Sequence, residues 1–440
     1  MKKKNSKKSV FKSKNIKHSF TGTRLTKYAG LSPIMKYIKK TKLGRELNEL
    51  FPTVMYNSTK FSNVQVFLSA VLASFVGVKR MARIATFTHD PLVTELLNLN
   101  TGLNKDVIST RLKAFGQAGA IKLQEHLFGY STNWLKKSNL ESISIDADST
   151  VETVYGNQQG AAKGYNSKKR GAKSYHPIIA FVSELKIVVN SWFRTGSAYT
   201  SNGICEFLKQ TKAILPENIK DVFFRADSGF FNGLLFDLLE SFGWTYLVKV
   251  KLKNLKQLLQ KQTWHIVPNN PDIAICEFNY QAKGWKKERK LRAIRTVTDW
   301  VEADFLGKKQ FVPVYEYACY CSNLDYDALE LHEIYKQRST SETWIEQVKS
   351  QLLAGATLTD NFHANDILWQ LAVLAYNLSV MMRYKFKKLW HEEHATFRDW
   401  FINLPGKLVK GGHQLNMKIY KHYAQKQKWN EFADYLAFTT

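Results

Sequence analysis

The sequence predicts an α/β protein with a mixed central sheet, a helical region before it and a β-strand insertion inside it. Residues 141–252 follow a β-β-β-α-β-α-β pattern of apolar periodicity, and residues 62–127 and 331–390 show helical spacing. Three further strand-like runs fall within residues 253–330. A chain of 440 residues with 44% hydrophobic residues is long enough to bury such a core.

The N-terminal 45 residues are strongly basic. They hold 15 Lys and Arg and no acidic residue, and so supply more than half of the net charge of +27. We expect residues 1–24 to form a disordered arm that gains affinity for DNA by releasing counterions from phosphates. A solubilising tail is the alternative. The overall charge favours a polyanionic partner over a neutral metabolite.

Composition argues against membrane, secreted and zinc-binding classes. The longest apolar stretch, Ile367 to Met382, contains polar residues and is shorter than the ~20 residues that cross a bilayer, so it predicts a buried helix. No apolar segment follows the basic N-terminus, as a secretion signal would require. The four cysteines lack zinc-site spacing. We therefore expect a cytoplasmic protein associated with the nucleoid.

Residues 25–135 are expected to form a helical DNA-binding domain. Apolar residues from Val64 to Phe75 recur at helical spacing, and a second helix is predicted to begin after Asn104 as its N-cap. A helix-turn-helix reader of DNA and a plain helical bundle fit this pattern equally well.

Residues 136–252 are expected to form the first part of a catalytic core. In Ser142–Asp148, isoleucines alternate with polar residues, as in a half-buried strand. Further elements are predicted in order: a hairpin over 176–184 and 186–193, a helix over 202–215, a strand over 221–226, a helix over 231–242 and a strand over 244–250. An antiparallel start followed by parallel crossovers is the order of a ribonuclease-H-like core.

The rest of the chain divides into three predicted regions. Residues 253–330 are expected to form a β insertion with strands at 273–280, 289–297 and 311–321. Residues 331–390 return to helix and complete the core. Residues 391–440 are basic and mixed, and are assigned to DNA binding or dimerisation.

Two aspartates end predicted core strands. Asp148 follows the first strand and Asp227 the fourth, which are neighbours in the expected strand order. Functional side chains collect at the carboxyl ends of strands in such sheets. Two carboxylates there suit Mg²⁺, which prefers oxygen ligands. Alternatively, each aspartate caps the turn that follows its strand.

A third acid lies on a predicted helix. Tyr335, Arg338, Glu342 and Lys349 are spaced i, i+3, i+7 and i+14, within an arc of roughly 60° on one helical face. One acid, two cations and a tyrosine would be costly on a dry core face. A solvated, ion-paired surface helix is the alternative.

The spacing Y-x2-R-x3-E-x6-K of these four residues resembles the Y-R-E-K signature of bacterial insertion-sequence transposases of the DDE type. The segments around Asp148 (Asp-Ala-Asp-Ser-Thr) and Asp227 (Arg-Ala-Asp-Ser-Gly-Phe-Phe) resemble those that carry the first and second catalytic aspartates of that family. The stretches 155–165 and 362–378 are also similar, and the motifs occur in the family's order over roughly residues 60–415.

The resemblance implies roles for particular residues. Asp148, Asp227 and Glu342 would hold two Mg²⁺ ions, for which Mn²⁺ could substitute. Tyr335, Arg338 and Lys349 would hold DNA phosphates near the scissile bond. The Gly-rich loop after the first aspartate would lie beside the DNA and contributes four cations: Lys163, Lys168, Lys169 and Arg170. Its alternative is a flexible surface loop.

Two neighbouring acids compete with these assignments. Asp146 shares a strand face with Asp148, but the family places Ser or Thr after the catalytic aspartate, as after Asp148. Glu346 lies one turn beyond Glu342, but only Glu342 fits the signature.

The implied function is a DNA transposase that cleaves double-stranded DNA at terminal inverted repeats and joins the 3′ ends to target DNA by a cut-and-paste route, as a homodimer on DNA and without a membrane partner. The alternative is a catalytically inactive, domesticated DNA-binding protein.

Overall fold

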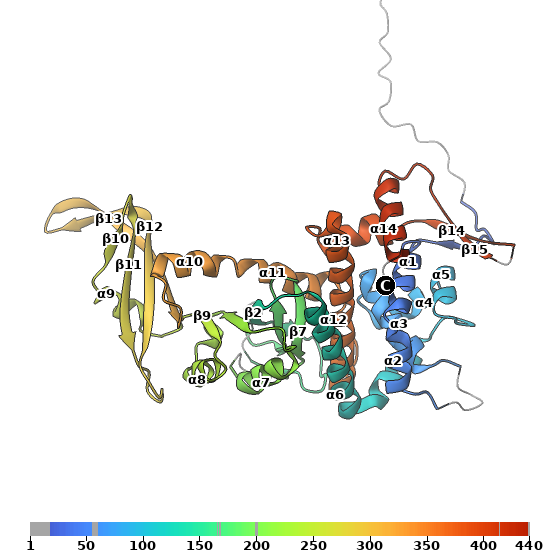
Figure 1. The fold of residues 1–440 in the computed structure, drawn as a ribbon, viewed down its shortest axis with the longest axis horizontal. Coiled ribbons are helices and arrows are strands. Elements are labelled where there is room, and N and C mark those ends of the chain that lie inside the picture. Colours follow the sequence, from blue (N-terminus) through green and yellow to red (C-terminus); the bar gives the residue numbers. More distant parts are fainter. Residues whose placement is uncertain are drawn as a thin grey trace, which may run out of the picture.

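A mixed sheet crosses the centre of the molecule in the computed structural model, which describes residues 18–54, 60–164, 166, 169–198, 201–412 and 414–438. Within these residues the sheet has nine strands in the order β10-β11-β12-β13-β9-β8-β2-β6-β7. A helical body lies at one end of the elongated molecule and the long strands β11–β13 at the other (Figure 1). The predicted arm falls mainly in residues 1–17, outside the described part.

Five strands form the core that the sequence predicts. They are β2 (Ser142–Ser149), β6 (Ile178–Val182), β7 (Ile187–Trp192), β8 (Asp221–Ala226) and β9 (Thr245–Lys249). β2 pairs in parallel with β8 and antiparallel with β6, β8 pairs in parallel with β9, and β6 and β7 form the predicted hairpin. α7 (Ile204–Ile214) and α8 (Gly233–Ser241) make the crossovers. This is the expected ribonuclease-H-like strand order.

The predicted buried helix is α12 (Phe362–Lys385), which packs against α3, α6 and β7 (Figure 1). Two of its polar residues have partners on the edge strand β7. Asn377 accepts from the N–H of Val188 and donates to its C=O, both at 2.8 Å, and Gln370 contacts Ser191. These side chains satisfy backbone groups that an edge strand leaves unpaired. No described helix is long and apolar enough to cross a membrane.

The β insertion extends the core sheet. Its elements are α9 (Leu255–Gln260), β10 (His265–Val267), β11 (Asn270–Tyr280), β12 (Arg289–Phe305) and β13 (Lys308–Ser322). β13 pairs antiparallel with β9, which makes the insertion continuous with the core. The β12–β13 hairpin is longer than predicted, because its outer half is exposed and carries little apolar alternation.

The helical body contains both ends of the described chain. Its N-terminal elements are β1 (Leu25–Thr26), α1 (Leu31–Lys40), α2 (Leu43–Leu50), α3 (Asn63–Phe75), α4 (Met81–Thr88), α5 (Pro91–Leu96) and α6 (Lys105–Lys137). Asn104 caps α6 as predicted, with its side chain accepting from the N–H of Asp106. From the other end come α13 (His394–Phe397), β14 (Gly406–Gly411), β15 (Gln414–Ile419) and α14 (Lys426–Phe438). β14 pairs with β1, and α14 packs on α1.

The helix predicted to carry the third acid is divided into α10 (Ala328–Lys336), α11 (Ser339–Glu346) and a π-helical turn (Gln347–Gln351). A small sheet of β3 (Glu152–Thr153), β5 (Lys173–Tyr175) and β4 (Ala162–Lys163) follows the end of β2. The sequence periodicity predicted neither the π turn nor this sheet.

Candidate active site

Two aspartates lie at the carboxyl ends of the parallel strands β2 and β8. Ala147 pairs with Ala226, so Asp148 and Asp227 follow at matching positions. Neighbouring strands are about 4.8 Å apart, which places both carboxylates at one edge of the sheet. Asp227 also caps the 3-10 turn Ser228–Phe230, accepting from the N–H of Gly229 at 2.9 Å. Asp227 thus forms the turn cap considered above, through its Oδ1.

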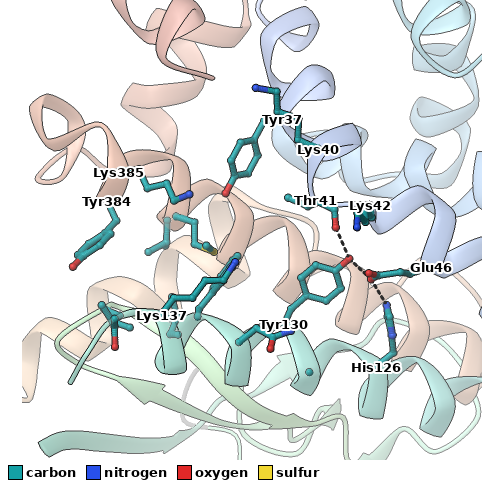
Figure 2. Close-up of a pocket in the computed structure, with 18 residues that line it drawn as sticks. Tyr37, Lys40, Thr41, Lys42, Glu46, His126, Tyr130, Lys137, Tyr384 and Lys385 are labelled. Carbon is teal, nitrogen blue, oxygen red and sulfur yellow. Dashed lines mark hydrogen bonds and ion pairs between the residues drawn. The ribbon is translucent and has the colours of Figure 1, made fainter. Parts of the chain in front are cut away.

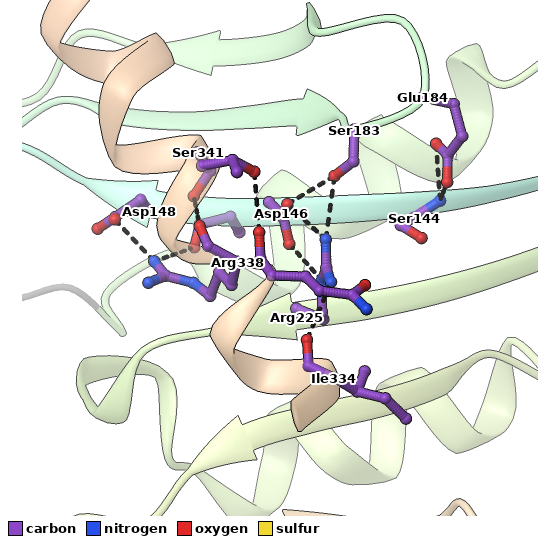
Figure 3. A network of polar contacts seen from close by, with 12 residues as sticks. Ser144, Asp146, Asp148, Ser183, Glu184, Arg225, Ile334, Arg338 and Ser341 are labelled. Atoms are coloured by element: carbon purple, nitrogen blue, oxygen red, sulfur yellow. Dashed lines mark hydrogen bonds and ion pairs between the residues drawn. The ribbon is translucent and has the colours of Figure 1, made fainter. Parts of the chain in front are cut away.

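Arg338 connects the sheet edge to α11. Its Nη2 donates to Asp148 Oδ2 at 2.7 Å, and its Nη1 lies 3.9 Å from Glu342 Oε1. The Arg338 side chain is 4% exposed, whereas that of Glu342 is 70% exposed. Asp148 and Glu342 therefore flank one buried guanidinium, and Figure 3 shows Arg338 reaching Asp148 from the helix.

The electrostatics of Tyr335 place all three acids in one region. Burial raises the pKa of Tyr335 to about 12, Arg338 lowers it, and Asp227, Asp148 and Glu342 each raise it. The pKa of Asp148 is raised to about 6 by burial, against the opposing effect of Arg338, and the charge of Asp227 raises it further. A buried carboxylate whose charge is disfavoured by burial and by a neighbouring carboxylate provides an environment that a cation would stabilise.

Asp146 has a different environment from Asp148. It forms a bidentate pair with Arg225, whose Nε lies 2.7 Å from Oδ1 and whose Nη2 lies 2.9 Å from Oδ2. Ser183 donates to the same carboxylate at 2.5 Å, and the Asp146 side chain is fully buried. Figure 3 shows this network beside Asp148. Its charge is neutralised by Arg225, which supports the choice of Asp148.

Glu346 lies near a different cation. The pKa of Lys79 is lowered first by burial and then by Arg398, and it is raised by Glu346. Glu342, by contrast, lies 3.9 Å from the guanidinium of Arg338, which also contacts Asp148.

Lys349 contacts the loop that follows β2. Its Nζ donates to Thr150 Oγ1 at 2.8 Å and to the C=O of Val151 at 2.5 Å. It lies beside Glu152, which is buried and whose pKa is raised to about 8 by burial, against the effect of Lys349. Glu152 and Thr150 could not be predicted from the sequence, because a two-residue strand after a turn has no periodicity to reveal which side chains are buried.

The Gly-rich loop presents exposed cations close to the end of β2. Lys163, Lys169 and Arg170 are exposed, and Lys169 Nζ lies 4.7 Å from the centre of the Tyr155 ring. Lys168 lies outside the described residues. A basic surface with an aromatic ring is suited to a nucleic-acid backbone.

The acids fit a hard divalent cation in chemistry, since all three supply carboxylate oxygens. The three carboxylates do not converge on one point in this structure. In the described part of the chain, no group of three or more His, Cys, Asp or Glu side chains lies close enough together to hold a metal. The reason is visible at Arg338, which sits between Asp148 and Glu342.

Comparisons with known proteins identify a family model and several similar structures. A family model described as transposase DDE domain group 1 matches residues 8–439. A cryo-EM structure of a piggyBac transposase synaptic complex with hairpin DNA is similar over 86% of this chain and 79% of that chain, with 11% identity and a TM-score of 0.47. A Mos1 transposase paired-end complex with left transposon end is similar over 50% of this chain and 77% of that chain, with 12% identity and a TM-score of 0.19. No curated protein matches the sequence significantly.

Proposed function

Because the chain belongs to the transposase DDE domain family, group 1, and is a transposase, we propose that it cleaves double-stranded DNA at the terminal inverted repeats of an insertion sequence and joins the ends to target DNA by a cut-and-paste route. The observation that carries this proposal is the pairing of Asp148 and Asp227 on neighbouring strand ends, with Glu342 across Arg338.

In this proposal Asp148, Asp227 and Glu342 hold two Mg²⁺ ions, with Mn²⁺ as a substitute. Bound divalent metals would lower the pKa of the attacking hydroxyl and stabilise the leaving oxygen. The Glu342 side chain is 70% exposed and has room to change rotamer, and we propose that it turns towards the aspartates to complete the site. A metal ion would also take over the neutralisation of Asp148 that Arg338 now provides.

Other residues of the chain act on the DNA. With a divalent cation held at Asp148, Arg338 would be available to direct its N–H groups to a phosphate beside the scissile bond. The phenolic O–H of Tyr335 donates a hydrogen bond to a backbone phosphate. Lys349 holds the loop after β2, and this contact keeps the cations of the Gly-rich loop beside the DNA. The cations are Lys163, Lys168, Lys169 and Arg170. Water or a 3′-hydroxyl attacks phosphorus, and the 3′-oxygen leaves with the cleaved strand.

Cutting two transposon ends requires two such sites, so we propose a homodimer on DNA. The competing function is a sequence-specific DNA-binding protein without catalysis.

A nicking assay on DNA that carries a transposon end, with Mg²⁺ or Mn²⁺, separates the two functions. The wild-type protein is expected to nick the end, and Asp227→Ala is expected to bind the same DNA without nicking it. If both proteins bind and neither nicks, the chain is the binder and the catalytic proposal is wrong.

A further inference from the structure

A cavity of about 560 Å³ lies where α1, α6 and α12 meet, next to the turn between β6 and β7 (Figure 2). That turn and Asp148 lie towards opposite ends of the paired strands β2 and β6. Val182, next to the turn, pairs with Ile145, whereas Ile179 pairs with Asp148. The cavity is therefore separate from the candidate active site, and the catalytic proposal does not use it.

We propose that this cavity binds a phosphorylated nucleoside, with the phosphate between Lys137 and Lys385 and the base against the aromatic walls. The proposal does not depend on the proposed catalytic function, because it concerns binding at a different place and needs no metal.

The lining of the cavity carries an excess of positive charge. Four lysines and one glutamate line it: Lys40, Lys42, Lys137, Lys385 and Glu46. The glutamate is already engaged, because Tyr130 donates to its Oε2 at 2.5 Å and His126 Nε2 lies 3.4 Å from the same oxygen (Figure 2). Lys40 donates to the C=O of Ala437.

Lys137 and Lys385 face each other without a counter-ion. Within the described residues neither amine forms an ion pair with a carboxylate, and Figure 2 shows both side chains reaching into the cavity. Burial lowers the pKa of Lys385, and the charge of Lys137 lowers it further. Two like charges held close together at a partly buried site are relieved by an anion, and a phosphate can accept hydrogen bonds from both amines.

The walls of the cavity favour a flat aromatic ligand over phosphate alone. Tyr37, Tyr130, Trp134 and Tyr384 line it together with the aliphatic Leu185, Ile187 and Val380. Nucleobases of any sequence stack on aromatic side chains. A volume of 560 Å³ is within the range of small-molecule sites and exceeds what a phosphate ion alone would fill. The nucleoside phosphate could be a free nucleotide or a nucleotide within a DNA strand.

Isothermal titration calorimetry of the full chain without divalent metal tests the proposal, using dAMP, deoxyadenosine, inorganic phosphate and a 5′-phosphorylated (dA)₃. We expect dAMP to bind more tightly than either deoxyadenosine or phosphate. The double variant Lys137→Gln/Lys385→Gln should bind dAMP roughly 100-fold more weakly, because two charge-assisted hydrogen bonds are lost.

Lys136→Gln is the matched control, because Lys136 is the adjacent exposed lysine on α6 and does not line the cavity. Its affinity for dAMP should equal that of the wild type. Binding of dAMP but not (dA)₃ would support a free nucleotide, and binding of both a DNA strand. Equal affinities for phosphate and dAMP, no binding of dAMP, or an unchanged affinity in a folded double variant would overturn the proposal.

Discussion

Two aspartates on the same face of β2 have opposite environments, and the difference lies in their position along the strand. Asp146 lies inside the strand, where Arg225 and Ser183 cover it, while Asp148 lies near the strand end and is contacted by Arg338. Residues at i and i+2 share a face, so periodicity could not separate the two. The family resemblance favoured Asp148, because Ser follows it in the sequence. The burial of Asp146 in an ion pair agrees with the choice of Asp148.

Glu342→Gln should abolish strand cleavage and leave binding of the transposon end largely intact. Glutamine keeps the size and one oxygen of glutamate but removes the charge that a divalent metal requires. Glu346→Gln is the matched control, since it lies one turn away near Lys79, and its cleavage rate should stay close to that of the wild type. Cleavage assays and gel-shift assays on the same transposon-end fragment measure strand cleavage and DNA binding. Equal loss of binding and cleavage in Glu342→Gln would contradict a metal-ligand role.

The buried His394 predicts acid sensitivity of the fold. Its Nε2–H donates to the C=O of Phe75 at 3.0 Å, and Ser379 lies 2.9 Å from Nδ1. Burial, followed by the charge of Arg383, lowers its pKa from 6.5 to about 3. A lowered histidine pKa gives stability that is present above pH 6.5 and is lost as the pH falls from 6.5 towards 3.

Thermal unfolding at pH 7 and pH 5 measures this effect. The wild-type Tm should fall more between these values than that of His394→Gln, which has nothing to protonate at this site. His391→Gln changes an exposed histidine three residues away and should lose Tm as the wild type does. The same loss of Tm in His394→Gln as in the wild type would show that the site does not titrate.

The ion pair between Asp146 and Arg225 connects three elements of the fold. It joins β2 to β8, and Arg225 Nη1 also donates to the C=O of Ile334 in α10 at 3.3 Å. Arg225→Met should lower the free energy of unfolding by about 3–5 kcal/mol, because it leaves the Asp146 charge buried without a partner. Urea denaturation measures the loss. Asp146→Asn/Arg225→Met should recover part of it, and no recovery would mean that packing rather than charge dominates.

How much could be predicted varies from element to element for physical reasons. The strand β2 was predicted because its apolar and polar residues alternate, and β8 because it is a short apolar run. The π turn at Gln347–Gln351 was not predicted from the sequence, because a local change of helical register has no signature in apolar spacing. The three candidate acids, Asp148, Asp227 and Glu342, were proposed from strand ends and from the family motif. The cavity lined by Lys137 and Lys385 could not be predicted, because residues near 40, 130, 185 and 385 meet only in the folded chain.

For the whole molecule, strand pairing joins the separate parts of the fold. β13 joins the insertion to the core, and the pairing of β1 with β14 brings the start of the described chain into the helical body. Residues 1–20 hold eight lysines, and we propose that they contact DNA.

Removal of residues 1–20 should weaken DNA binding and flatten its salt dependence. The segment holds eight lysines, so the slope of log K against log[salt] should fall by up to about 7 if all of them neutralise phosphates. Titrations at several salt concentrations measure the slope. A variant with the same twenty residues in shuffled order should keep it, because counterion release depends on charge and not on sequence. An unchanged slope after truncation would exclude the arm from DNA contact.

The most direct measurement is anomalous diffraction at the manganese edge from crystals of the chain bound to a transposon end and soaked in Mn²⁺. We predict two anomalous peaks within bonding distance of carboxylate oxygens of Asp148, Asp227 and Glu342, with Arg338 withdrawn from Asp148. Manganese bound elsewhere, with these three side chains arranged as they are in the free chain, would contradict the proposed mechanism.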